Sequence, residues 1–264
     1  MDYIFNTLIA FIVLCFIFGL LEYFFRANKS QPSLLKRPDK YTDLLYFFIA
    51  SPINKAVENF GILIVLAAIY GNDPEAIKNA IYHSNFLIGH LPATLQIIAM
   101  LIIGDFTSYW LHRGFHSKKL WKFHIIHHSP PHLDWLAAAR GHPINNIVQG
   151  WINILILLLL GCNPQHLEAY LPFLLLHGVL VHSNVRWTYG YIGKWLVSPQ
   201  FHRWHHTSQK EGLDKNFGGI LTIWDRAFGT FYMPQNCFPN KFGVTQTIPN
   251  SFIKQILYPF RRNS

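Results

Sequence analysis

Histidines recur in three short clusters whose spacing could bring several imidazoles together. His112 and His116 are four residues apart, which places both on one face of a helix. The pattern His-x-x-His-His follows twice, first at His124, His127 and His128 and again at His202, His205 and His206. Burying that many imidazoles without a cation would leave ring nitrogens without partners. The spacing therefore predicts a metal centre.

The number of histidines indicates two ions. A structural zinc ion takes four ligands, usually including thiolates, and a catalytic zinc ion takes about three and a water molecule. The three cysteines, Cys15, Cys162 and Cys237, are far apart and form no CxxC motif, so a thiolate site is not expected. The five glutamates lie away from the clusters, and we expect an all-nitrogen centre. Imidazole suits iron, zinc, copper and nickel, and spacing alone does not choose among them.

Ligating imidazoles usually donate their second N–H to a carboxylate or a carbonyl. Asp105, Asp225 and Asp214 are the acids available for this role. Asp105 shares a helical stripe with His112, so it is the best placed. A turn or cap role is the alternative for Asp225.

The elements that must position these residues are apolar helices. The chain has 264 residues, of which 51% are hydrophobic and only 13% are charged, against about 25% in typical soluble proteins. Apolar runs of spanning length or nearly so cover residues 4–25, 44–70 (with its spanning core at 60–70), 94–111, 147–160 and 167–181. A signal peptide is the weaker interpretation of the first run, because no basic residue precedes it and no cleavage site follows. We expect an all-α integral membrane bundle with about four to five spanning helices, forming a single domain over residues 1–264.

Basic residues predict the orientation of these helices. The segments after the first, third and fifth runs carry nearly all the lysines and arginines, whereas the two opposite loops hold only Lys78. The positive-inside rule then places all three histidine clusters, as a helical cap, and the C-terminus in the cytoplasm. The net charge of +9 fits loops that face anionic lipid. No basic helix indicates a nucleic acid partner.

The motifs resemble those of the fatty acid hydroxylase / sterol desaturase superfamily, which are membrane di-iron oxygenases. The resemblance covers about residues 95–235 and is closest to the branch with alkylglycerol monooxygenase and bacterial sterol desaturase-like proteins. It is carried by the three histidine clusters in order and by further short motifs: Arg140-x-His142-Pro143, the run from His182 to Arg186, Asn216-Phe217-Gly218-Gly219, and the run from Trp224 to Thr230.

The resemblance implies two Fe ions held by all three clusters, with His182 as an additional ligand. His142 and His177 are further candidates. It also implies O2-dependent hydroxylation or desaturation of a lipid from the bilayer, such as a sterol, a fatty acyl chain or an ether lipid. The chain has no GxGxxG or CxxCH motif, so electrons would come from a separate donor of the cytochrome b5, ferredoxin or reductase type. We expect that donor to dock near Lys118, Lys119 and Lys122. The membrane would be a bacterial inner membrane or the endoplasmic reticulum, depending on the source.

Two other functions are compatible with the clusters. One is a zinc-dependent membrane hydrolase that uses a metal-bound hydroxide. The other is a non-catalytic protein that binds a metal or a lipid; a transporter is disfavoured because the clusters follow the apolar runs rather than lying within them. Among the enzymes, only the oxygenase requires O2 and a reductant.

Overall fold

The computed structural model describes residues 2–82, 87–235 and 237–261, and within these ranges it contains helices and isolated bridges but no extended strands. The α-helices are α1 (Asp2–Phe24), α2 (Lys40–Leu45), α3 (Ser51–Tyr70), α4 (Pro74–Tyr82), α5 (Ala93–Phe115), α6 (Trp121–His128), α7 (Pro143–Leu159), α8 (Pro164–His182), α9 (Pro199–His205), α10 (Ile223–Ala227) and α11 (Phe252–Ile256). The predicted all-α class is confirmed.

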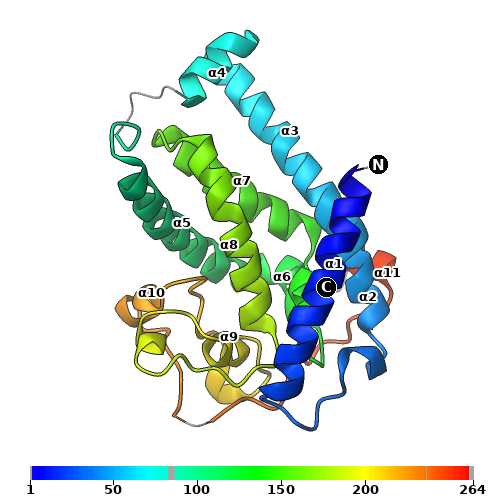
Figure 1. Ribbon diagram of the computed structural model, residues 1–264. Helices are drawn as coiled ribbons and strands as arrows, with labels where there is room; N and C mark the ends of the chain where they lie inside the picture. The colour runs from blue at the N-terminus through cyan, green and yellow to red at the C-terminus, as the bar shows by residue number, and fades with distance from the viewer. Residues whose placement is uncertain (1, 83–86, 236, 262–264) are drawn as a thin grey trace.

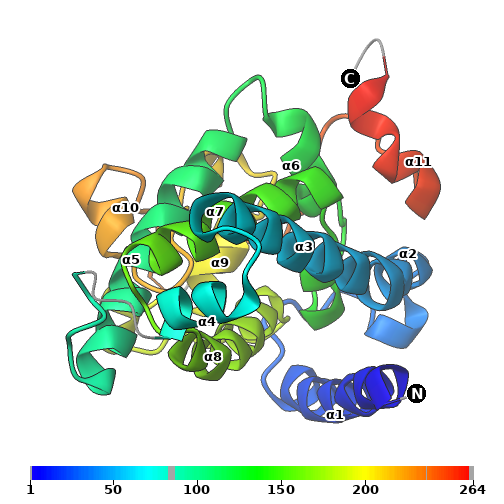
Figure 2. The ribbon, with the colours of Figure 1, turned by 90° about the horizontal axis from the view of Figure 1, so that it is seen from above.

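Three helical segments are long and apolar enough to cross a membrane, namely Phe5–Phe24, Lys40–Ala68 and Ala93–Phe115. The apolar helices Pro143–Leu159 and Tyr170–His182 are shorter. Helices α1, α3, α5, α7 and α8 are the long helices of the molecule (Figure 1), and α1 stands at the edge of the group (Figure 2). The predicted membrane bundle is thus present, and a count of four or five spans stays a prediction.

The second apolar run differs from expectation at Pro52. From the sequence, the part of this run before Pro52 is expected to be bent or to lie at the membrane interface, but α2, η2 (Tyr46–Ala50, a π-helical turn) and α3 follow one another without a break. Proline has no N–H and cannot donate to the carbonyl four residues earlier. The Ser51 N–H bonds to the carbonyl of Tyr46, five residues earlier, so the helix widens just before Pro52 and continues.

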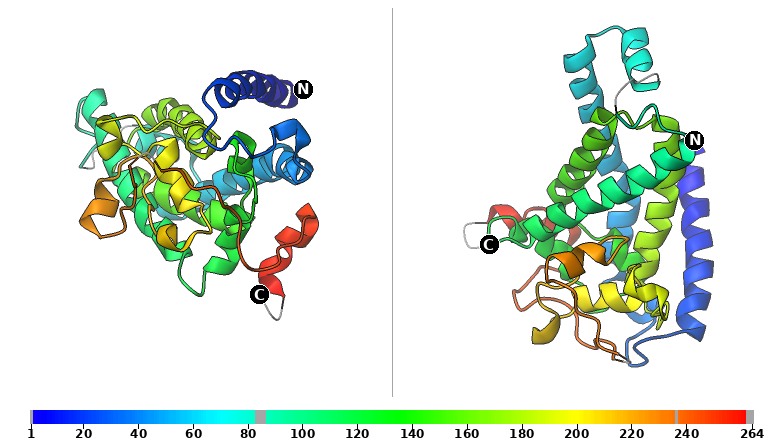
Figure 3. Two further views of the ribbon diagram at one scale, coloured as in Figure 1. Left: turned by 90° about the horizontal axis from the view of Figure 1, so that it is seen from below. Right: turned by 90° about the vertical axis from the view of Figure 1, so that its left-hand side faces the viewer.

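The remaining helices gather at one end of the bundle. Helices α6, α9 and α10, with the loops that join them, lie at the lower end in Figure 1, and α4 lies at the opposite end (Figures 1 and 3). Buried apolar side chains such as Met100, Leu157 and Tyr170 pack α5, α7 and α8 together above this layer. The bundle thereby fixes the ends of α5 and α8 from which the histidines project.

A buried ion network ties the segment after α1 to the layer that carries the histidines. The fully buried Arg37 side chain lies 3.0 Å from Asp39 and 2.7 Å from Asp134, and it also pairs with Asp43. Arg140 pairs with Asp39 and Asp43 in turn. Two guanidinium groups and three carboxylates therefore form one connected network, because buried charges persist only when paired.

Candidate metal centre

The structure brings nine histidines together in two adjacent groups. Within each group the potential ligand atoms all lie within 4.8 Å of one another. The first group holds His112, His116, His124, His128 and His205, and the second holds His127, His182, His202 and His206. All nine were singled out from the sequence, and either group could hold a metal ion.

Local sequence ends the helices at the site. The α6 helix ends at His128, and the double proline Pro130-Pro131 follows closely. The α9 helix begins at Pro199, which needs no hydrogen-bond partner at a helix start, and the hydroxyl of the N-cap Ser198 accepts from the N–H of Phe201 at 3.3 Å. The end of α6 and the beginning of α9 thus place the histidines of these two helices beside the ends of α5 and α8.

Most of the imidazoles have their Nδ1 atoms directed away from the centre. Four of them lie within hydrogen-bond distance of backbone carbonyls: His112 to Phe217 (2.9 Å), His127 to Arg140 (2.8 Å), His182 to Gly178 (2.6 Å) and His205 to Lys215 (2.8 Å). A carbonyl can only accept, so each of these Nδ1 atoms carries the proton. In the neutral ring the Nε2 atom then has a free lone pair.

Pairs of Nε2 atoms face one another across the site. The Nε2 atoms of His112 and His124 are 3.1 Å apart, and those of His127 and His182 are also 3.1 Å apart. His124 donates its own Nδ1–H to the Asn145 side-chain oxygen at 3.0 Å. Neither pair can form a hydrogen bond when both Nδ1 atoms hold the protons, and two facing lone pairs repel. A cation bound to both nitrogens removes this conflict, so the donor set fits a metal.

Burial keeps the imidazoles neutral, as metal ligation requires. It lowers the pKa of His127 to about 4 and lowers the pKa values of His128 and His206 well below the ordinary range, with repulsion from neighbouring imidazoles as the second cause for the latter two. In addition, the Nε2 atoms of His116 and His205 are buried without a hydrogen-bond partner in the described chain. Such unpaired buried acceptors are costly unless an ion binds them.

Asp105 and Asp225 do not bond to imidazoles, contrary to expectation. Asp105 accepts from the backbone N–H groups of Ile220 (2.7 Å) and Leu221 (2.9 Å) and from the Trp224 indole. Asp225 accepts from the N–H groups of Phe217 and Gly218 and from the Thr230 hydroxyl. Both carboxylates accept hydrogen bonds from the backbone of the segment 217–221. Asp105 lies on the same face of α5 as His112, but its neighbour on that face is this segment and not an imidazole. The two carboxylates position the segment whose Phe217 carbonyl accepts the hydrogen bond from the Nδ1–H of His112.

The three remaining candidates have separate roles. His142 caps α7, with Nδ1 accepting from the Ile144 N–H and Nε2 donating to the Ile256 carbonyl, and it lies outside both groups. His177 also lies outside them and donates to the Gly219 carbonyl at 3.1 Å. The Asp214 carboxylate is 3.1 Å from His116 Nδ1, as expected of an acid that orients an imidazole.

Asn145 contacts the candidate ligand His124 and was not among the residues predicted from the sequence. Its side-chain oxygen fixes the tautomer of His124, and it also accepts from Gln149 at 3.2 Å. Asn145, Gln149 and Asn153 recur every four residues on the largely apolar α7. That polar stripe was visible in the sequence and marks the face of α7 that looks toward the site.

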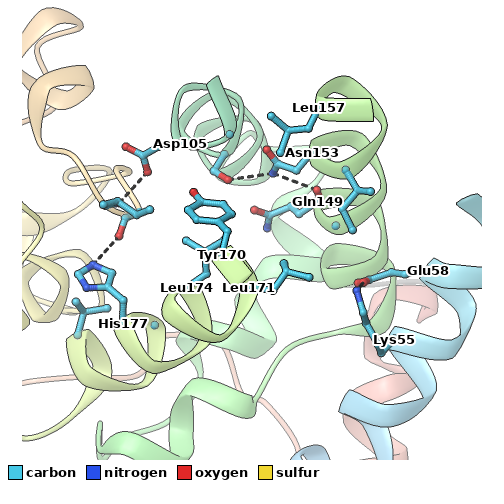
Figure 4. A pocket seen from close by; sticks show the side chains of 18 of the residues that line it. Lys55, Glu58, Asp105, Gln149, Asn153, Leu157, Tyr170, Leu171, Leu174 and His177 are labelled. Atoms are coloured by element: carbon cyan, nitrogen blue, oxygen red, sulfur yellow. Dashed lines mark hydrogen bonds and ion pairs between the residues drawn. The ribbon is translucent and has the colours of Figure 1, made fainter. Parts of the chain in front are cut away.

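Several hollows reach the histidines in the described part of the chain, among them the following three. A cavity of about 380 Å³ between α3, α5, α7 and α8 extends to His182 and His202 (Figure 4). A chamber of about 190 Å³ is lined by His112, His124 and His127, and Gln149 lines both hollows. A third hollow, of about 430 Å³, opens elsewhere and is lined by polar and apolar residues: His116, Lys118, Trp121, His128, His205, Thr207, Ser208, Leu213, Asp214, Gly243, Val244, Thr245 and Gln246. The two histidine groups can therefore be approached separately.

The fold and the site define a helical membrane protein with a histidine cluster fit for metal. The chain belongs to the fatty acid hydroxylase family, whose model matches residues 97–230. This finding confirms the resemblance drawn from the motifs.

Several characterised proteins are similar to the chain. An ornithine lipid hydroxylase of Rhizobium tropici is 32% identical over 207 residues, which are 75% of this chain and 62% of the relative. Human alkylglycerol monooxygenase is 35% identical over 128 residues, or 48% of this chain and 28% of the relative. Rat lathosterol oxidase is 30% identical over 183 residues, covering 65% and 54% respectively. The chain thus spans less than two thirds of the length of these relatives. No solved structure matches it.

Proposed function

We propose that the protein uses O2 and external electrons to hydroxylate or desaturate a membrane lipid at a di-iron centre. The observation that carries this proposal is the opposition of unprotonated Nε2 atoms in two adjacent histidine groups, each large enough for one ion. The names of the relatives, which are a lipid hydroxylase, a monooxygenase and a sterol oxidase, support oxidation over zinc-dependent hydrolysis or simple binding.

The chain's own residues would hold the metals and exclude water. The nine histidines of the two groups would be the ligands, and bound iron would supply the oxidation of an unactivated C–H bond by O2. The backbone carbonyls of Phe217, Arg140 and Lys215 keep the ligand protons on Nδ1. Preset tautomers leave Nε2 free for the metal at neutral pH.

The lipid would reach the centre from the bilayer through the cavity between α7 and α8. Its walls are largely apolar, with Leu157, Leu171 and Leu174 among the lining residues, and it ends at His182 and His202. Apolar walls with a few polar groups are typical of sites that bind hydrocarbon ligands. We propose that the histidine end of the bundle faces the cytoplasm, in accord with the distribution of basic residues.

Electrons would enter from the opposite side. The 430 Å³ hollow is lined by His116, His128 and His205, and it reaches them without passing through the apolar cavity. Trp121 lies beside it, with its ring centroid 5.0 Å from that of His116. Lys118 on the rim and the exposed Lys119 would attract an acidic face of a separate electron carrier.

The test is product formation with labelled oxygen. Iron-loaded protein is incubated with membrane lipids, a reductant system and ¹⁸O2, and the lipids are analysed by mass spectrometry. Hydroxylation incorporates one ¹⁸O atom into the product, and desaturation removes two hydrogen atoms. His127→Ala should abolish either change, whereas His166→Asn, near the far end of α8, should leave it intact. Lipid cleavage without O2 would support the hydrolase instead.

A further inference from the structure

Two oppositely charged residues line the apolar cavity within a candidate membrane span. Lys55 and Glu58 belong to α3, inside the segment Lys40–Ala68, and both line the cavity that reaches His182 and His202. Their side chains are 46% and 13% exposed, and Lys55 Nζ lies 3.5 Å from the Glu58 carboxylate. Charged groups are costly inside a membrane and typically mark the path or site of a polar substrate.

Close packing fixes the Glu58 carboxylate in the cavity wall. Gly150 of α7 faces it, and a Cβ atom there would lie 2.5 Å from Glu58 Oε1. The neighbouring Trp151 indole donates to the Glu58 backbone carbonyl at 3.0 Å. A Cβ atom at Gly61 would overlap the Trp151 ring. Two glycines thus allow α3 and α7 to approach around Glu58, which holds its carboxylate beside the cavity.

The carboxylate has spare capacity to accept hydrogen bonds. Within the described chain its hydrogen bond is the long one from Lys55, at 3.5 Å. A carboxylate offers about four lone-pair sites, and Lys55 keeps further N–H donors. Both members of the pair can therefore bind a ligand group without losing a strong internal contact.

The rest of the cavity is suited to the other parts of an amphiphile. Gln149 and Asn153 of α7 line the same cavity as Glu58, whereas Leu171 and Leu174 of α8 form an apolar wall (Figure 4). The cavity therefore offers polar groups beyond the ion pair, and hydrocarbon would lie against the leucines of α8.

We propose that Lys55 and Glu58 bind the headgroup of a zwitterionic lipid, one that carries both an ammonium and an anionic group. The inference rests on the proposed oxidation of a lipid and names the class of that lipid. The ammonium would pair with Glu58 and the anion with Lys55, so the internal ion pair is exchanged for two pairs without burying net charge. A neutral lipid offers neither partner, and an anionic lipid would leave Glu58 facing like charge. The anion is a carboxylate in an amino-acid lipid or a phosphate in a phospholipid.

Binding is tested without turnover. Full-length protein loaded with zinc, which fills nitrogen sites but does not support oxidation, is reconstituted in nanodiscs and titrated with four probes. These are an amino-acid lipid whose headgroup keeps a free ammonium and a free carboxylate, phosphatidylethanolamine, phosphatidylglycerol and diacylglycerol. Native mass spectrometry reports the bound fraction. At least one zwitterionic probe should bind roughly tenfold or more tightly than diacylglycerol, as expected for charge-assisted hydrogen bonds.

Variants separate recognition from folding. Glu58→Gln and Lys55→Met should each remove the zwitterion preference while zinc content stays the same, and Lys78→Met, in the exposed pair with Glu75, should retain it. Equal binding of zwitterionic and neutral probes to the parent protein would overturn the proposal, as would an unchanged preference in a folded Glu58→Gln protein. The ¹⁸O2 assay is independent: oxidation of neutral lipids without this preference would refute the headgroup site and leave the oxygenase standing.

Discussion

His127 and His182 meet with their Nε2 atoms 3.1 Å apart, although each carries its proton on the far nitrogen, bonded to a backbone carbonyl. The two residues are 55 positions apart in the chain and come from the ends of α6 and α8. Burial keeps both rings neutral, so a repulsive contact of this kind is relieved when an ion lies between the nitrogens. The stability of the fold should therefore depend on metal and on pH.

Removing the metal should lower the thermal stability, and the chelated protein should lose further stability in mild acid. Above pH 6.5 the folded and unfolded forms of His127 are both neutral, and its titration does not affect the free energy of unfolding. Because burial lowers the folded pKa to about 4, only the unfolded chain takes up a proton between pH 6.5 and pH 4, so stability falls as the pH falls. Melting of chelated and metal-loaded protein between pH 8 and pH 5 checks this. A melting temperature that is independent of metal would contradict it.

Asn145 should be needed for full metal affinity. Asn145→Leu removes the acceptor that keeps the His124 proton on Nδ1, and loss of such an outer contact typically costs about 10- to 100-fold in affinity. Asn153→Leu is a matched control two turns along the same helix, because Asn153 bonds to Ser108 rather than to a histidine. Competition with a metal indicator measures both variants. Equal affinities would show that the Asn145 contact is incidental.

Asp225 should act through the loop that it holds. In Asp225→Asn an amide N–H would face the donor N–H of Gly218 or Phe217, which costs about 1–3 kcal/mol for an unsatisfied buried group. We expect a lower melting temperature and weaker metal binding, since Phe217 supplies the acceptor for His112. Asp214→Asn, whose side chain is 76% exposed, should change the melting temperature less. Metal affinity and unfolding are measured on both proteins.

The Arg37 network should be essential for folding. Arg37→Met leaves Asp39, Asp43 and Asp134 short of a buried counter-charge, and breaking a buried ion network in this way costs about 3–5 kcal/mol. Lys78→Met breaks an exposed pair and should cost less than about 1 kcal/mol. Denaturant or thermal unfolding in detergent distinguishes the two. Comparable stability of both variants would mean that Arg140 alone can neutralise the carboxylates.

Charge reversal should weaken electron delivery without affecting the metal. We expect Lys118→Glu with Lys119→Glu to raise the KM for an acidic electron carrier several-fold, with the effect fading at high salt because exposed charges are screened. Lys78→Glu, on the exposed α4 at the opposite end of the molecule, is the control. Turnover is compared at low and high ionic strength with metal content measured in parallel. Unchanged turnover in the double variant would place the docking surface elsewhere.

The sequence by itself identified the class of fold and the set of candidate ligands. Imidazoles at spacings of three and four residues can share a helix face, so the spacing of His124, His127 and His128 is enough to mark them as one unit. The low charge content and the apolar runs likewise predicted the helical membrane bundle. Both inferences rest on periodicity, which is a local property of the chain.

Only the tertiary structure decided what depends on contacts between distant segments. It divided nine histidines into groups of five and four, and it placed His142 at a helix cap and His177 on a loop carbonyl. It also made backbone N–H groups, and not an imidazole, the hydrogen-bond partners of Asp105. It placed Lys55 and Glu58 in the wall of a cavity that reaches His182. Spacing along a helix fixes which face a side chain occupies, but the partner on that face comes from elsewhere in the chain and is set by packing.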